Sequence, residues 1–263
     1  MNTPLALLPR LAAFIALSAT GALHAATLVD DQFIDNGVTN GTDAQDAGWT
    51  ANNLGLSITP FNSTGNTSNA LRLAPSTTFS IANGVFSSSA LAIGESITVS
   101  FDFRMTSTVV NNDAGLRFGL SSSANTYGAT LGTGTTTGFG IAQYATNTLS
   151  GGTGYTTTGA PIAINDNASH TFSFQITRTS GTSLSFLATV DSNTVSAVTS
   201  NSISNFTFTN IILGQGSTTH IFNIDNVLVT TAIPEPSSTA LLLGAGILSA
   251  TLVARPKRRQ SLR

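Results

Sequence analysis

Apolar and polar residues alternate without interruption along residues 96–105, SITVSFDFRM. A period of two over this length predicts a β-strand with one buried and one solvated face. Residues 169–179, SHTFSFQITRT, repeat the pattern, and a Ser180-Gly181-Thr182 turn separates them from the apolar run SLSFLATV. We therefore predict that these two runs form a β-hairpin. Shorter strands are predicted at residues 54–58, 70–73, 78–81, 116–120, 139–144, 206–208 and 221–229.

No part of residues 27–232 shows sustained helical periodicity. Short strands separated by turns rich in Gly, Asn and Ser predict an all-β fold, a two-sheet antiparallel β-sandwich of the jelly-roll type. Residues 133–158 contain TGTTTG and GGTGY, which predict a pair of loops around one strand. Because no Pro-rich or charged linker divides this region, we expect one β-sandwich ectodomain over residues 27–232.

Residues 1–26 have the organisation of a secretory signal peptide. Arg10 supplies a positive charge, residues 11–17 form a short apolar core, and small residues lead to Ala25 and Ala26. We place the cleavage after one of these two alanines. The alternative is a buried N-terminal helix.

The C-terminal region contains a second apolar segment, residues 237–254, without any charge. As a helix it would span roughly 27 Å, close to the thickness of a bilayer core. Pro234 and Pro236 end any regular structure before it. The basic tail, residues 255–263, follows the segment, and the membrane stop consists of Arg255, Lys257, Arg258 and Arg259. The positive-inside rule then keeps this end in the cytoplasm and places the β-sandwich across the membrane.

Pro234-Glu235-Pro236, the apolar segment and the basic cluster occur in a fixed order, and residues 233–263 as a whole resemble the PEP-CTERM sorting signal of Gram-negative bacteria. The resemblance implies that an exosortase, an integral-membrane cysteine transpeptidase, recognises the triplet and cleaves nearby, much as lipid-anchor signals lose their hydrophobic tails. It implies a transient inner-membrane intermediate and a final location at the cell surface or in the extracellular matrix. Pro256 departs from the family pattern because it interrupts the basic cluster. The alternative is an ordinary single-span anchor that is never cleaved.

Composition and charge exclude several kinds of partner and chemistry. Charged residues make up 8% of the chain, against about 25% in average soluble proteins. The absence of Cys excludes disulfides, thiolate metal sites and a cysteine nucleophile. Four basic and eleven acidic residues lie between Ala26 and Ile233, which gives this region a net charge of −7, and none of the four is Lys. Because such a surface repels nucleic acid and anionic lipid, we expect no nucleic-acid partner.

Three local features resemble the concanavalin-like, or laminin-G-like, jelly rolls. They are an acidic strand at residues 28–33, the hairpin that precedes Asp191-Ser192-Asn193, and the closing strand FNIDNVLV at residues 222–229. The resemblance implies a fold that also occurs in glycosidases and lectins, so both catalytic and glycan-binding residues have to be considered.

A glycosidase needs two carboxylates that flank one glycosidic bond. Family members of that kind carry Glu-x-Asp-x-Glu along one strand, whereas Glu95 is the one Glu of residues 27–232 and Asp102 follows seven residues later. Neither His170 nor His220 has an acid and a nucleophile at a recognisable spacing, and no Ser lies in a G-x-S-x-G elbow. We therefore predict no catalytic activity. A polysaccharide-degrading enzyme with an unfamiliar active site is the remaining enzymatic alternative.

The acidic stretch DDQFIDNGVTNGTDAQDAGW suggests a metal site, because Ca²⁺ takes six to eight oxygen ligands. The first and last strands of jelly rolls are often neighbours, which would bring Asp225 close to Asp31, and Asp35 lies on the same stretch. These three residues are the candidate Ca²⁺ ligands. The spacing matches no EF-hand or RTX loop, and the alternative is a set of solvated acids in a loop without any cofactor.

Glycan binding requires aromatic platforms with amide or hydroxyl donors nearby. Tyr127, Tyr144 and Tyr155 lie in or beside the Gly/Thr-rich loops and are the candidate glycan-binding residues, whereas Trp49 is expected in the core. The expected function is that of an exported, exosortase-sorted protein of the cell surface or exopolysaccharide matrix with no catalytic activity. The alternative is a lectin-like module that binds extracellular polysaccharide, with or without Ca²⁺.

Overall fold

The computed structural model describes residues 25–34, 37–38, 45–52, 54–61, 68–75, 80–105, 116–122, 140–145, 148–150, 156–158, 167–191, 193–198, 205–215 and 221–233. All of them except Ile233 belong to one compact unit, Ala25–Ala232. None of the described residues forms a helix long and apolar enough to cross a membrane. Most of the predicted signal peptide and the predicted transmembrane segment lie outside the described residues.

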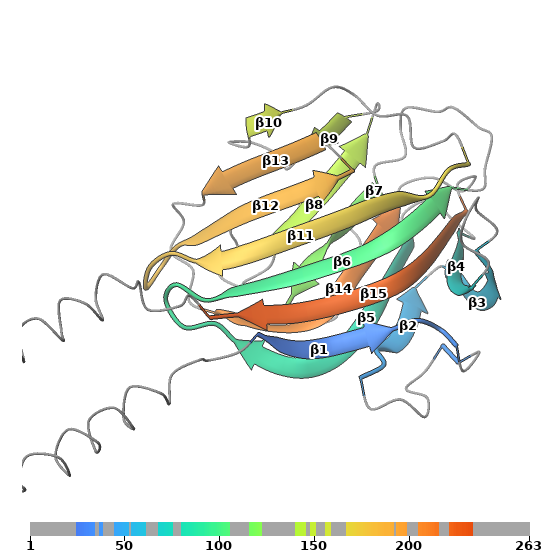
Figure 1. The fold of residues 1–263 in the computed structure, drawn as a ribbon, viewed down its shortest axis with the longest axis horizontal. Coiled ribbons are helices and arrows are strands. Elements are labelled where there is room, and N and C mark those ends of the chain that lie inside the picture. The colour runs from blue at the N-terminus through green and yellow to red at the C-terminus, as the bar shows by residue number, and fades with distance from the viewer. Residues whose placement is uncertain are drawn as a thin grey trace, which may run out of the picture. The chain divides into compact units, whose positions relative to one another are not determined.

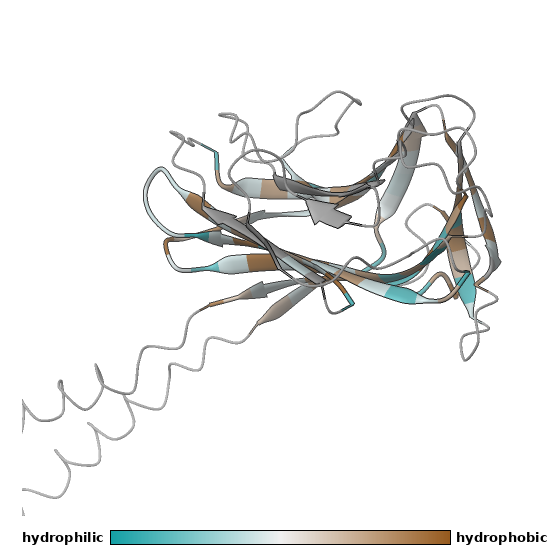
Figure 2. Ribbon diagram, turned by 90° about the horizontal axis from the view of Figure 1, so that it is seen from above, coloured by the Kyte–Doolittle hydropathy of each residue, from teal (hydrophilic) through white to brown (hydrophobic). Residues whose placement is uncertain are grey.

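The described strands form two antiparallel sheets that face each other, as Figures 1 and 2 show. The nine-stranded sheet A has the order β10 (Thr156–Thr158), β13 (Asn193–Val198), β12 (Leu184–Val190), β11 (His170–Arg178), β6 (Ser96–Met105), β15 (Phe222–Ala232), β4 (Asn69–Pro75) and β3 (Leu54–Pro60), and β1 (Ala26–Asp31) also pairs with β15. The six-stranded sheet B has the order β2 (Gly48–Asn52), β5 (Ser80–Ala90), β14 (Thr207–Gln215), β7 (Leu116–Ser121), β8 (Gly140–Ala145) and β9 (Thr148–Ser150). The predicted all-β fold with two antiparallel sheets is confirmed.

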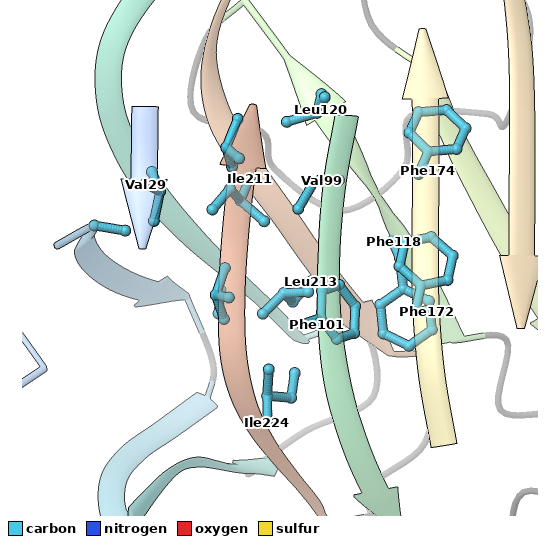
Figure 3. Close-up of a cluster of buried hydrophobic side chains, with 14 of the residues drawn as sticks. Val29, Val99, Phe101, Phe118, Leu120, Phe172, Phe174, Ile211, Leu213 and Ile224 are labelled. Atoms are coloured by element: carbon cyan, nitrogen blue, oxygen red, sulfur yellow. The ribbon is translucent and has the colours of Figure 1, made fainter. Parts of the chain in front are cut away.

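The core lies between the sheets and is built around three phenylalanine rings. Phe101 of β6 and Phe172 of β11 come from sheet A, and Phe118 of β7 comes from sheet B (Figure 3). The three ring centroids are separated by 4.9 Å (Phe101–Phe172), 5.2 Å (Phe101–Phe118) and 4.7 Å (Phe118–Phe172). We call this group the Phe triangle. The alternating patterns of residues 96–105 and 169–179 predicted which side chains of β6 and β11 point inward.

The predicted hairpin is formed by β11 and β12, with Phe172 opposite Val190 and Arg178 opposite Leu184. Two strands are much longer than predicted. β14 reaches Gln215, and its central residues Ile211, Ile212 and Leu213 are all buried, so both faces are covered and no period of two is visible.

β5 extends over Ser80–Ala90, whereas only residues 78–81 were predicted as a strand. Ala82, Gly84 and Phe86 lie on the face directed at the core, and two of these three residues are too small to produce a visible apolar alternation. Gly84 is the register partner of Trp49 of β2. The indole of Trp49 packs so closely on Gly84 that it leaves too little room for a Cβ at this position.

Substitution of Gly84 is therefore expected to destabilise the fold. A Cβ at position 84 would lie 3.0 Å from two atoms of the Trp49 ring. We expect Gly84→Ala to lower the free energy of unfolding by about 1–3 kcal/mol through overpacking, measured by urea denaturation. The control is Gly55→Ala in β3, whose Cβ would lie at an ordinary 3.5 Å from the Ala74 carbonyl oxygen. Equal stability of the two variants would contradict this account of Gly84.

Candidate functional site

Most residues of the predicted sorting and glycan-binding sites lie outside the described residues. This holds for Pro234, Glu235 and Pro236, for the basic tail, and for Tyr127 and Tyr155. Asp35, a candidate Ca²⁺ ligand, also lies outside the described residues. Tyr144 lies on β8, opposite Leu116 of β7 and Leu149 of β9. The assignments to the sorting signal and to the three tyrosines stay predictions.

Asp31, at the end of β1, is buried, and its carboxylate accepts hydrogen bonds from three N–H groups. Its Oδ2 accepts hydrogen bonds from Trp49 Nε1 at 2.8 Å and from Ala47 N at 3.4 Å, and its Oδ1 accepts one from Phe33 N at 3.2 Å. Burial raises the pKa of Asp31 from 3.8 to about 6, and Asp46 acts in the same direction, while the hydrogen bonds oppose the shift. Asp31 thus fixes the indole of Trp49, and the expectation that Trp49 belongs to the core is confirmed.

The first and last strands are neighbours, as predicted, because β1 pairs with β15. Asp31 lies opposite Val227, two residues from Asp225. The two carboxylates nevertheless have different partners, since Asp225 accepts hydrogen bonds from Ser68 Oγ and from the backbone N–H of Asn226. Within the described ranges, no group of three or more His, Asp or Glu side chains could hold a metal ion. The calcium site, which also needs Asp35, stays a prediction.

A pair between a buried histidine and a more exposed carboxylate links the two strands of the hairpin. His170 Nδ1 lies 2.7 Å from Asp191 Oδ2, and the imidazole packs against the ring of Phe103. The other carboxylate oxygen of Asp191 accepts a hydrogen bond from Thr171 N. Spacing along the sequence identified no acidic partner for His170. The register of the predicted hairpin could have identified Asp191, because Asp191 follows β12 and lies beside the first residues of β11.

Asp102 and Asp225 are register partners on β6 and β15, and both carboxylates are used within the fold. Asp102 accepts hydrogen bonds from Thr171 Oγ1 at 2.8 Å and from Asn226 Nδ2 at 2.9 Å. Asn226 has a left-handed backbone (φ 53°) at an irregularity in the register of β15 with β6, a conformation that Asn tolerates better than most residues. These contacts join β11, β6 and β15 through side chains and define a structural role for the two carboxylates.

Three polar side chains are buried on the face of sheet B that points away from sheet A. They are Asn83 of β5, Asn210 of β14 and Ser121 of β7. Each of them is next to a core residue in the sequence: Asn83 follows Ala82, Asn210 precedes Ile211, and Ser121 follows Leu120. Because neighbouring residues of a strand point to opposite faces, the polar side chains are directed away from the core. Asn210 is the register partner of Ser121, and Asn83 is that of Ile212, so the three residues lie in adjacent rows of the sheet. We call them the sheet B polar cluster.

Asn210 is the member of this cluster with unused hydrogen-bonding capacity. Its Nδ2 donates to Thr209 Oγ1 at 2.7 Å. Its Oδ1 is buried and accepts no hydrogen bond from the described residues. A buried acceptor of this kind costs about 1–3 kcal/mol if it stays unpaired, so such a group needs an explanation. Uncharged amides and hydroxyls match the donors and acceptors of sugar hydroxyl groups.

Comparisons with known proteins add little to this geometry. No protein-family model and no curated protein matches the chain. Solved structures that resemble it include a carbohydrate esterase from bacteriophage phi24B (14% identity, TM-score 0.48, covering 80% of this chain and all of that one). Lectin II from Ulex europaeus (11%, 0.44, 81% and 100%) and an endo-1,3-beta-glucanase from Streptomyces sioyaensis (13%, 0.44, 82% and 99%) are two others. At these identities and TM-scores the similarity says nothing about a ligand or a reaction.

The raised pKa of Asp31 predicts a pH-dependent stability. A carboxyl group whose folded-state pKa lies near 6, above its ordinary value of 3.8, binds its proton more tightly in the folded chain. The free energy of unfolding should therefore decrease as the pH rises from about 4 to about 6. In Asp31→Asn the amide Oδ1 can still accept from Trp49 Nε1, but this contribution no longer titrates.

The measurement is urea unfolding from pH 4 to pH 7, followed through the fluorescence of Trp49, the single tryptophan of the chain. The wild type should lose stability relative to Asp31→Asn over this range. Parallel pH profiles for the two proteins would show that Asp31 does not have a raised pKa.

Proposed function

We propose that the protein is an exported, non-catalytic glycan-binding protein that an exosortase delivers to the cell surface or exopolysaccharide matrix. The glycan-binding part rests on Asn210 Oδ1, which is buried on the face of sheet B directed away from the core and accepts no hydrogen bond from the described residues. Ser121 lies opposite Asn210 in the neighbouring strand. Glycan binding would have to uncover this oxygen, to which a sugar hydroxyl can then donate. A few placed polar groups are typical of ligand sites.

The non-catalytic part rests on the use of the described carboxylates inside the fold. Asp31 binds Trp49, and Asp102 and Asp225 accept hydrogen bonds from neighbouring strands and loops. Glu95 Oε2 accepts a hydrogen bond from the backbone N–H of Ala92 in a tight turn. A glycosidase needs two carboxylates that face a substrate, and each of these four already binds groups of the chain itself.

The sorting part rests on residues 233–263 and their resemblance to PEP-CTERM signals. The triplet Pro234-Glu235-Pro236 would be recognised by the exosortase, and residues 237–254 would hold it at the membrane. The basic residues Arg255, Lys257, Arg258 and Arg259 would keep the end of the chain in the cytoplasm. Glycan binding would then retain the released sandwich in the matrix.

Glycan binding is tested on an array of neutral and acidic glycans, with calcium present and with a chelator. We expect wild-type protein to bind at least one glycan and Asn210→Ala to raise the Kd about tenfold or more, which corresponds to the loss of one or two hydrogen bonds. The matched control is Gln175→Ala, which removes an amide from β11 of sheet A. A blank array, or equal loss in both variants, would refute the assignment. Loss of binding in chelator would reveal a calcium requirement.

Sorting is tested by fractionation of cells that contain an exosortase. We expect the wild-type chain to be processed, while Glu235→Ala accumulates at full length in the inner membrane because the recognition triplet is lost. Ser237→Ala, two residues away, serves as the control and should be processed normally. A full-length wild-type chain that remains in the inner membrane would identify residues 237–254 as a permanent anchor.

A further inference from the structure

The chain enters and leaves the sandwich at the same end. Ala26, the first residue of β1, pairs with Thr231, and Ala232, the last residue of β15, pairs with Ser96 of β6. The β5–β6 turn and the β11–β12 turn lie at this end as well, on the left of Figure 1. We call residues 25–26, 90–95, 179–183 and 231–232 the tether end, because the predicted transmembrane segment, residues 237–254, follows it along the chain.

The tether end includes a hydrogen-bonded turn at residues 92–95. Glu95 N donates to Ala92 O at 3.1 Å, and the Glu95 side chain accepts from Ala92 N at 2.8 Å. Gly94 has φ 91°, which fits the third position of a type II turn. Ile93, in the second position, is exposed to 62%. The turn thus holds a large apolar side chain in solvent.

Arg178 ties this turn to the rest of the sandwich. Its Nη1 donates to Leu91 O at 2.8 Å, and its backbone carbonyl accepts from Gly94 N at 2.7 Å. The guanidinium carbon lies 3.7 Å from the centroid of the Phe206 ring. Ile93 therefore lies in a turn that hydrogen bonds connect to Arg178 of β11, and not at the tip of an isolated loop.

The tether end differs in charge from the rest of the acidic domain. Glu95 is its one charged residue, and Arg178, the last residue of β11, borders it; both bind groups of the turn. Its other described residues are uncharged, and most of them are Ala, Gly, Ser or Thr. The strand-borne acids nearest to it, Asp30 and Asp31, lie four and five residues along β1 from Ala26. Repulsion from an anionic membrane is consequently weakest at this end of a domain with a net charge of −7.

Chain length places this end close to the bilayer in the anchored precursor. Four residues, 233–236, separate β15 from the apolar segment that begins at Ser237. Fully extended, they reach at most about 14 Å, and the headgroup region of one leaflet is itself roughly 5–8 Å thick. A supported apolar side chain at this end is therefore within reach of the lipid interface.

We propose that the tether end is a membrane-docking surface of the anchored precursor and that Ile93 enters the interfacial layer of the phospholipid bilayer. This inference rests on the proposed function, because it requires residues 237–254 to span the membrane. Docking holds the sandwich against the bilayer and keeps the Pro-Glu-Pro triplet at the membrane surface, where an integral-membrane peptidase acts. Cleavage releases the tether, and one isoleucine is too little to hold the free domain on lipid.

The experiment uses the full-length chain in vesicles of phosphatidylethanolamine and phosphatidylglycerol. Because the chain has no Cys, Ile93→Cys carries a single environment-sensitive fluorophore. Ile34→Cys is the matched control, since Ile34 is exposed to 65% and follows the far end of β1. We expect the label at position 93 to shift to shorter emission wavelengths and to be quenched about twofold by nitroxide lipids with the spin label near the headgroup. The label at position 34 should remain in water.

Alkaline carbonate extraction of the same vesicles separates the two hypotheses. Release of the chain would show that residues 237–254 do not anchor it, which would overturn the sorting proposal and the docking surface together. A retained chain whose labels at 93 and 34 behave alike would overturn the docking surface and leave the sorting proposal intact. Shielding at position 93 only after an exosortase is added would replace lipid with protein as the partner and would also refute lipid docking.

Discussion

The sandwich depends on the packing of the Phe triangle between its two sheets. The chain has no disulfides and few charges, so stability has to come mainly from apolar burial. Phe101, Phe118 and Phe172 come from three strands and two sheets, and each ring packs against the other two. Such aromatic pairs contribute about 0.5–1.5 kcal/mol beyond their burial, and loss of one ring leaves a cavity that costs about 3–5 kcal/mol. Because the triangle bridges both layers, it fixes how the sheets face each other.

Once the sheets are fixed in this way, several of the described carboxylates join neighbouring strands. Asp31 holds Trp49 of β2 against β1, and Asp102 binds side chains from β11 and β15. Each carboxylate oxygen that accepts an N–H or O–H group avoids the cost of a buried, unpaired polar atom. This use of acids explains how a domain with eleven acidic and four basic residues can fold without a matching set of ion pairs. Asp31 and Asp225, two of the three candidate Ca²⁺ ligands, are among the acids that accept such hydrogen bonds.

The sequence allowed the fold class to be predicted because β6 and β11 bury one face and expose the other, which produces a period of two. The predicted strand at residues 206–208 fell short of β14 because the central residues of β14 are buried on both faces. The one at residues 78–81 fell short of β5 because Ala82 and Gly84, which face the core, are small. The site was less predictable. His170 meets Asp191 through the register of the β11–β12 hairpin, whereas Asn210 lies opposite Ser121 through a pairing of strands far apart in the sequence. Side-chain chemistry alone marks none of these residues.

The position of β15 connects the fold to its proposed export. β15 is the last strand of the sandwich, and it pairs with β6, β4 and β1. Until β15 is in place, one edge of each of these three strands is unpaired, and unpaired strand edges promote aggregation. The sandwich can therefore close only after residue 232, two residues before Pro234, is available to pair. If the Pro-Glu-Pro signal acts as we propose, the membrane segment that follows it holds the chain at the membrane while the last strand inserts. Cleavage after that step would release a domain whose central strands are already paired.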